Sequence, residues 1–146
     1  MADVRIGLSL MGAALVVAAG GAFGAPAQPS IKQQMKSIVD GASTAVFGIA
    51  GDADPANGPP PPVIAAPRWE AAADAAGKLK GVGLSLQDPA RAKDQGDWMT
   101  FAKQFTDLSD AAAKAAAAHD GAALAKAAND LSDNCSACHA KYKPQG

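Results

Sequence analysis

Apolar side chains recur every three or four residues in four separate stretches of the chain, a spacing that places them on one face of a helix. In the first stretch they are Ile31, Met35, Ile38, Ala42, Ala45 and Ile49. Ser30 stands three residues before Gln33, as in a capping box, so we expect a helix from about Ile31 to Ile49. The segment 51–62 comes next. Its Asp-Pro and Asn-Gly pairs and its four consecutive prolines predict an extended connector without helix.

The next two stretches predict a second and a third helix. Pro67 suits the first turn of a helix, and Gly81 and Gly83 are expected to end it. The apolar stripe of this second helix is Trp69, Ala72, Ala73, Ala76 and Leu79. Asp88 followed by Pro89 has the form of a cap and a first-turn proline, so a third helix is expected from there to about residue 118. Its stripe is Trp98, Phe101, Phe105, Leu108 and Ala112.

The fourth stretch predicts a helix that begins near Gly121 and ends at about Lys143. Its apolar positions are Leu124, Ala128, Leu131, Cys135, Cys138 and Tyr142. A short turn precedes this helix, whereas the connection between the first two helices is longer. Four amphipathic helices joined in this way predict an all-α, antiparallel four-helix bundle.

Composition supports helices and excludes two classes of protein. Alanine is the most frequent residue and aromatic residues make up only 5% of the chain, which disfavours strands and rules out an all-β fold. Thirteen Lys and Arg against fourteen Asp and Glu give a net charge of -1. No basic surplus is available to neutralise phosphates, so nucleic-acid binding is not expected.

The first 27 residues have the pattern of a secretory signal peptide. Arg5 supplies a positive charge, residues 6–19 are apolar, and small residues stand before Ala27 where cleavage is expected. A membrane anchor is the alternative, but an apolar run of about 14 residues is short of the roughly 20 that span a bilayer. We therefore expect residues 28–146 to be exported as one mature domain without a membrane span.

The chemistry of the chain is concentrated in the pentapeptide 135–139. Cys135, Cys138 and His139 form a C-x-x-C-H motif, the pattern of covalent haem c attachment. Positions i, i+3 and i+4 share one face of a helix, so both sulfurs can bond one edge of a haem while the imidazole reaches its iron. The predicted cofactor is one haem c, attached through Cys135 and Cys138 and ligated by His139.

Three other uses of the two cysteines compete with haem. A disulfide would close a very small loop and stabilise little, and it would leave His139 unexplained. A thioredoxin-like pair is expected next to a strand and helix unit, and no strand is predicted before this motif. A zinc site needs a fourth ligand, for which His119 and scattered carboxylates have no customary spacing. Haem is the favoured interpretation.

A C-x-x-C-H motif near the end of an exported four-helix chain resembles the class II cytochromes c, the group of cytochrome c′ and cytochrome c-556. The residues that carry the resemblance are Cys135, Cys138, His139, Tyr142 and Met35. It implies a haem inside the bundle, held by the last helix with its other face toward the first helix, in the bacterial periplasm. It also implies that two bundles can pair into a homodimer.

Two further positions matter to the resemblance. Met35 lies where relatives of the cytochrome c-556 type place a second iron ligand, although methionine also fills ordinary core positions. Many relatives carry an arginine one turn earlier to meet a haem propionate, whereas this chain has Ile31 there. Lys32 and Arg68 are therefore candidate propionate partners.

The predicted function is electron transfer by a periplasmic monohaem cytochrome that exchanges single electrons with partner redox proteins, without catalytic turnover of its own. His139 and Met35 together would give a six-coordinate, low-spin iron suited to this role. The alternative is a five-coordinate protein of the cytochrome c′ type that binds nitric oxide or carbon monoxide. That alternative requires Met35 not to reach the iron.

Overall fold

The computed structural model describes residues 28–59 and 63–143, and within these ranges the regular structure is entirely helical. The predicted signal peptide, residues 1–27, lies outside the described residues. The first long helix consists of three consecutive pieces, and the others are single α-helices. In chain order the elements are α1 (Ile31–Gln34), η1 (Met35–Val39), α2 (Asp40–Ala53), η2 (Pro55–Asn57), α3 (Ala66–Leu86), α4 (Asp97–Ala117) and α5 (Gly121–Tyr142).

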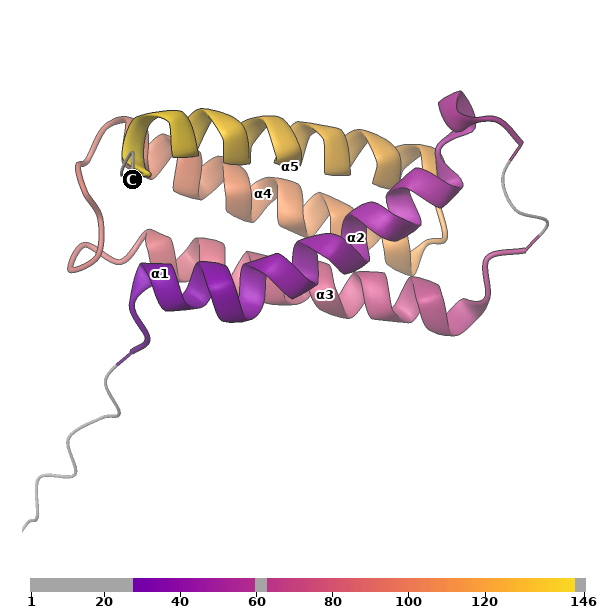
Figure 1. Cartoon of the computed structure of the whole chain (residues 1–146), viewed down its shortest axis with the longest axis horizontal. Coiled ribbons are helices and arrows are strands. Elements are labelled where there is room, and N and C mark those ends of the chain that lie inside the picture. Colours follow the sequence, from indigo (N-terminus) through magenta and orange to yellow (C-terminus); the bar gives the residue numbers. More distant parts are fainter. Residues whose placement is uncertain (1–27, 60–62, 144–146) are drawn as a thin grey trace, which may run out of the picture.

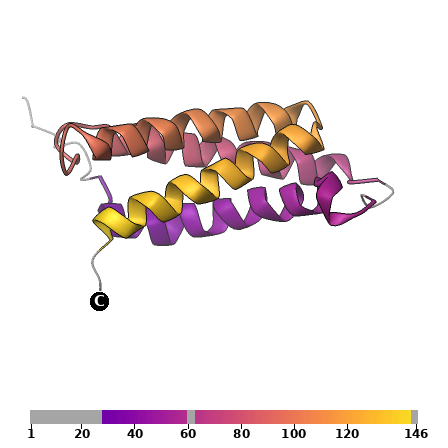
Figure 2. The same ribbon diagram turned by 90° about the horizontal axis from the view of Figure 1, so that it is seen from above.

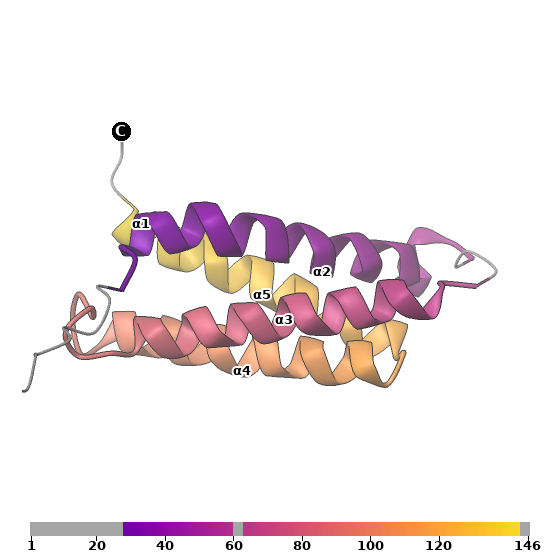
Figure 3. The same ribbon diagram turned by 90° about the horizontal axis from the view of Figure 1, so that it is seen from below.

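The four long helices lie side by side and run antiparallel, as a helical bundle (Figures 1 and 2). α3 packs against α4, α4 against α5, and α2 against both α3 and α5. The start of α1, the loop between α3 and α4, and the end of α5 meet at one end of the bundle (Figures 1 and 3). Among the helices of the described residues, none is long and apolar enough to cross a membrane.

The first helix starts as predicted and then departs from regular α geometry. Ser30 and Gln33 form the expected capping box, each side chain bonding the backbone of the other. Met35–Val39 is a π-helical turn, in which the amide of Asp40 donates to the carbonyl of Met35. In α2 the predicted positions Ala42 and Ile49 are buried, together with Val46 and Ala50, while the predicted Ala45 is half-buried.

Two predicted helix ends were wrong. The first helix does not stop at Ile49 but continues to Ala53, and a 3-10 turn lies within the segment expected to be an extended connector. α3 runs through Gly81 and Gly83 to Leu86. A Cβ at Gly83 would lie 2.4 Å from Thr106 Oγ1, so this glycine permits close approach of α4 instead of ending the helix.

The predicted start of the third helix at Asp88 was also wrong, because the local caps there close a turn. The Asp88 carboxylate accepts from the amide of Ala90, which completes a small turn. The Asp94 carboxylate then accepts from the amides of Gly96 and Trp98, and α4 begins at Asp97. The fourth helix agrees with the prediction, with Asp120 as its cap.

Small side chains make up most of the core, which allows the helices to pack closely. About half of the buried positions are alanines, and the largest fully buried side chains are Leu79, Leu124, Leu131 and Val46. The two tryptophans are buried at opposite ends of the bundle, Trp69 near the start of α3 and Trp98 near the start of α4. Trp69 stacks on His119, which has a positive φ of 54° in the turn between α4 and α5.

Candidate functional site

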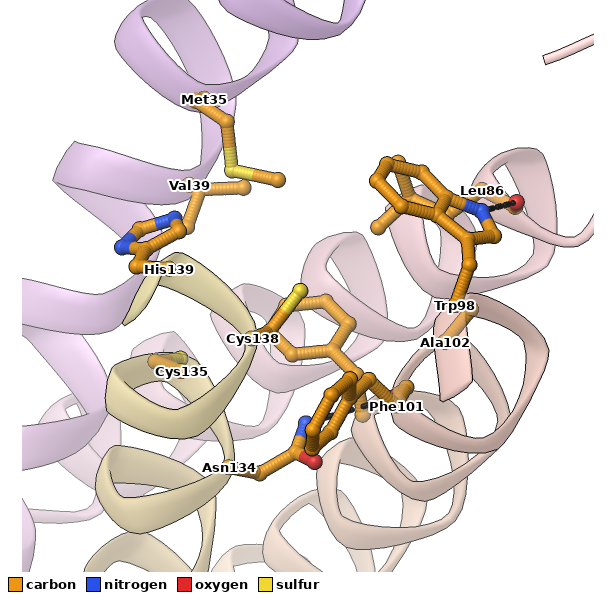
Figure 4. A pocket seen from close by; sticks show the side chains of 11 residues that line it. Met35, Val39, Leu86, Trp98, Phe101, Ala102, Asn134, Cys135, Cys138 and His139 are labelled. Carbon is orange, nitrogen blue, oxygen red and sulfur yellow. Dashed lines mark hydrogen bonds between the residues drawn. The ribbon is translucent and has the colours of Figure 1, made fainter. Parts of the chain in front are cut away.

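One pocket opens at the end of the bundle where η1, α4 and the last turns of α5 meet (Figure 4). It brings together all four residues that the sequence predicted as haem ligands or anchors. The pocket is lined by Met35, Val39, Leu86, Trp98, Phe101, Ala102, Phe105, Asn134, Cys135, Cys138 and His139. Helix packing explains its position, because η1 packs against α3 and α2 but is not among the closely packed partners of α5.

Cys135 and Cys138 lie one turn apart on the face of α5 that borders the pocket (Figure 4). Both side chains are half-buried, and both thiols are free. Burial raises the pKa of each thiol, with a smaller contribution at Cys135 from neighbouring Cys138. At neutral pH both thiols are therefore protonated, which disfavours rapid disulfide exchange.

His139 follows Cys138 directly and is exposed at the mouth of the same pocket. Its ring lies beside Val39, between the last turns of α5 and η1 (Figure 4). The helix thus presents two sulfurs and one imidazole to a single space, which is the arrangement expected from the i, i+3, i+4 spacing.

Met35 reaches the pocket from the opposite wall, and its thioether points into the cavity (Figure 4). It is the first residue of the π turn and is half-buried against the core. Such turns are rare in proteins, and those that occur are often at functional sites. The other methionine of the described residues, Met99, also packs on the core but does not line the pocket.

Aromatic side chains from α4 form the remaining wall. Trp98 is buried and donates its Nε1–H to the Leu86 carbonyl at 2.8 Å, which fixes the indole against the end of α3. Phe101 and Phe105 continue the apolar surface one and two turns later. This wall excludes water from the side of the pocket that faces α4.

The end of α5 is fastened to the start of α4 just beyond His139. The Tyr142 hydroxyl donates to the Asp94 carboxylate, and Lys141 pairs with Asp97. The Tyr142 ring stands edge-on to Trp98, with centroids 5.1 Å apart and an interplanar angle of 83°. These contacts hold the C-x-x-C-H turn against the aromatic wall.

The same contacts change the acidity of both partners. The Tyr142 hydrogen bond, followed by that of the Trp98 amide, lowers the pKa of Asp94. Burial, followed by the nearby Asp94 carboxylate, raises the pKa of Tyr142. Tyr142 is therefore a neutral donor and Asp94 an ionised acceptor at neutral pH. Sequence analysis named Tyr142 but missed Asp94, whose place just before α4 was the only available signal.

A polar cluster lies at the same end of the bundle as the pocket, without lining it (Figure 1). Gln34, which precedes Met35, is 6% exposed, and its amide exchanges hydrogen bonds with Ser85, which precedes Leu86. Arg91, from the loop between α3 and α4, donates to Gln34 Oε1 at 2.8 Å and to the Pro29 carbonyl at 3.0 Å. Sequence analysis singled out neither Gln34 nor Arg91.

The basic residues that the sequence analysis did name lie elsewhere. Arg68 pairs with Asp52 at 2.5 Å, near the start of α3 and the end of α2, at the opposite end of the bundle from the pocket (Figure 1). Arg68 is therefore not placed to meet a haem propionate in this pocket. Lys32 is exposed on α1.

The side chains that line the pocket suit a haem chemically, but the pocket is too small to hold one in this conformation. The walls are apolar, and the donor set of two thiols, an imidazole and a thioether is the one that a c-type haem uses. The cavity measures about 40 Å³ within an open cleft of about 420 Å³, so a macrocycle needs side chains along the cleft to turn aside or η1 to move away from α5. The weak packing between η1 and α5 allows such an opening.

Comparisons with known proteins leave the pocket as the main guide to function. The chain matches no family model, no curated protein and no solved structure. Within residues 28–59 and 63–143, no group of three or more His, Cys, Asp or Glu side chains could hold a metal ion. The interpretation of the pocket is therefore argued from its own side chains.

Proposed function

We propose that this chain is a periplasmic monohaem c-type cytochrome, similar to the class II cytochromes c, that transfers single electrons between partner redox proteins. The observation that carries the proposal is the pocket. Cys135, Cys138 and His139 open together from one helix onto an apolar cleft, and Met35 faces them from another helix (Figure 4). A covalent haem gives each of these four side chains a task.

Each of these residues has a distinct task in the proposal. Cys135 and Cys138 anchor the group when each thiol adds across one of its vinyl groups, so that sulfur bonds carbon and the thiol hydrogen moves to the neighbouring carbon. The raised thiol pKa values are compatible with neutral sulfhydryls before attachment. His139 and Met35 would hold its iron from the two walls of the cleft. The haem, when bound, supplies the one-electron chemistry of its iron.

The rest of the protein would control the surroundings of that group. Trp98, Phe101 and Phe105 keep water from one side of the cleft. The Tyr142 bond to Asp94 holds the turn that carries His139 and so restrains the position of the proximal ligand. Restrained ligands reorganise little when the iron changes its charge, which favours electron transfer over ligand exchange.

The protein surface gives limited guidance on the partners. Lys126 and Lys141 lie on α5, the proposed haem helix, but each pairs with an aspartate, Asp130 and Asp97 respectively. Their charges are therefore partly neutralised, so a strongly basic docking surface is not expected there. The proposed donor and acceptor are other periplasmic redox proteins, and the location follows from the predicted signal peptide.

A gas-binding role is the second candidate, favoured by one specific observation. Val39 lines the cleft from the same π turn as Met35 and has no atom that can ligate iron (Figure 4). If Val39 rather than Met35 faces the iron, the sixth position is open to nitric oxide or carbon monoxide. The protein would then be five-coordinate, as in cytochrome c′.

The deciding experiment begins with expression in a host that matures c-type cytochromes. Covalent haem is shown by a protein mass increased by one haem that persists in denaturant, and by its loss in a Cys135→Ala, Cys138→Ala variant. Spectra of the oxidised and reduced protein are then recorded with and without carbon monoxide. A low-spin spectrum without a carbon monoxide shift supports electron transfer. A high-spin spectrum with a large shift supports gas binding, and a colourless protein overturns both.

A further inference from the structure

Arg91 is a half-buried cation without a counterion among the described residues. It takes part in no ion pair there, although its guanidinium donates to Gln34 and to the Pro29 carbonyl. Its Nε is buried and has no hydrogen-bond partner. A charge removed from water is costly unless it is paired, and an unpartnered donor adds to that cost. The position therefore favours a bound anion.

The surroundings of Arg91 are organised and do not resemble those of a free surface side chain. Its backbone amide donates to the Asp88 carbonyl at 2.8 Å, within the turn that the Asp88 carboxylate caps. Gln34, which accepts from Arg91, is held in turn by Ser85. The guanidinium is thus fixed between the start of the first helix and the loop after α3.

The place of the cluster connects it with the cleft. Gln34 and Ser85 are the chain neighbours of Met35 and Leu86, and both of these line the cleft. Arg91, which donates to Gln34, is therefore close to the chain segments that form this end of the cleft, although it does not line it. The planar guanidinium suits a carboxylate in particular, because each terminal nitrogen carries two hydrogens and gives only one to Gln34 or Pro29, so one on each remains for the two oxygens of a carboxylate.

We propose that Arg91, supported by Gln34 and Ser85, forms a carboxylate-binding subsite beside this end of the cleft. This inference rests on the proposed function if the carboxylate belongs to a haem held by Cys135 and Cys138. It stands apart from that function if the carboxylate is a small free acid. The subsite takes the role for which the sequence analysis considered Lys32 and Arg68.

The test uses the holoprotein and measures the reduction potential as a function of pH. A carboxylate beside an arginine has its pKa lowered by about one to three pH units. In Arg91→Gln we expect the carboxylate-linked step in the curve to move up by about one pH unit or more. Arg91→Lys keeps the positive charge but not the planar guanidinium, so it should move this step less. Arg68→Gln removes an arginine at the other end of the bundle and should leave the curve unchanged.

Added acetate distinguishes the two sources at constant ionic strength. If the haem supplies the carboxylate, acetate leaves the wild-type and Arg91→Gln curves where they are. If a free acid occupies the subsite, acetate shifts the wild-type curve and not that of Arg91→Gln. Superimposed curves for wild type and Arg91→Gln, with and without acetate, would overturn the subsite while leaving the cytochrome proposal intact.

A colourless protein would refute the proposed function but would still test the subsite. Acetate is then titrated into the full chain while its tryptophan fluorescence is recorded, to which Trp98, whose indole bonds to Leu86 next to Ser85, contributes with Trp69. A saturable change in the wild type that is lost in Arg91→Gln supports a free-carboxylate site. An identical response in both proteins overturns it.

Discussion

Gly83 sets how closely α3 and α4 approach each other. An added Cβ would lie 2.4 Å from Thr106 Oγ1 and 3.0 Å from Phe105 Cδ1, and both of these neighbours are buried. Gly81, two residues earlier on the same helix, is exposed and has no atom within 4 Å of an added Cβ. The two glycines therefore form a matched pair in which only one is required by packing.

We expect Gly83→Ala to lower the free energy of unfolding by about 1–3 kcal/mol, because overpacking forces neighbouring side chains or backbone to shift. Gly81→Ala should instead raise it by about 0.5–1 kcal/mol, since alanine restricts the unfolded chain and favours helix. Urea unfolding followed by circular dichroism measures both. Equal effects of the two substitutions would show that α4 does not press against α3 at Gly83.

A single substitution also tests whether Met35 ligates the iron. In Met35→Leu we expect the oxidised holoprotein to become high-spin and to gain affinity for carbon monoxide, because leucine fills the space without ligating iron. Met99→Leu is the control, since Met99 packs on the core away from the cleft. Absorption spectra record both effects. A high-spin spectrum that is the same in the wild type and in Met35→Leu would mean that the sixth position is already open in the wild type.

Contacts between elements explain where sequence analysis succeeded and where it did not. The capping box before α1 and the aspartate cap before α5 are local, so the starts of both helices were predicted. Gly83 looked like a helix end because its partner, Thr106, comes from another helix. The π turn at Met35 likewise has no sequence pattern of its own.

The packing of α3 on α4 also has an electrostatic component that depends on pH. Asp110 of α4 bonds to Lys114 on its own helix and to Lys80 on α3, and these ammonium groups hold the pKa of Asp110 at about 2. A pKa lowered by folding stabilises the folded state above the ordinary value of about 3.9, and this contribution is lost as pH falls toward the folded pKa.

We therefore expect Asp110→Asn to be less stable than the wild type at pH 7, with a difference that shrinks as pH falls from about 4 to about 2. Thermal unfolding across this range measures the difference. Asp107→Asn is the control, since Asp107 pairs only with Lys103 on its own helix. A deficit of the same size at pH 2 and pH 7 would mean that Asp110 acts through packing and not through its charge.

At the scale of the whole molecule, the candidate site is assembled from both ends of the chain at one end of the bundle. The motif 135–139 and Met35 were predicted because each has a local or positional signal. Arg91 and Asp94 were not, because Arg91 meets Gln34 across 57 residues and Asp94 meets Tyr142 across 48. Helical periodicity carries no information about such distant pairs.

The bundle is packed unevenly, and this predicts which parts depend most on haem. α3 and α4 form the most extensive helix pair, whereas η1 is not closely packed on α5. In the Cys135→Ala, Cys138→Ala variant, which cannot attach haem, we expect the amides of η1 and of the last turns of α5 to exchange hydrogen faster than in the holoprotein. The amides at the centre of the α3 and α4 pair should change much less, because sparsely packed regions open locally before the core does. Hydrogen exchange measured by mass spectrometry tests this, and equal protection of η1 in both proteins would mean that haem does not bridge the cleft between η1 and α5.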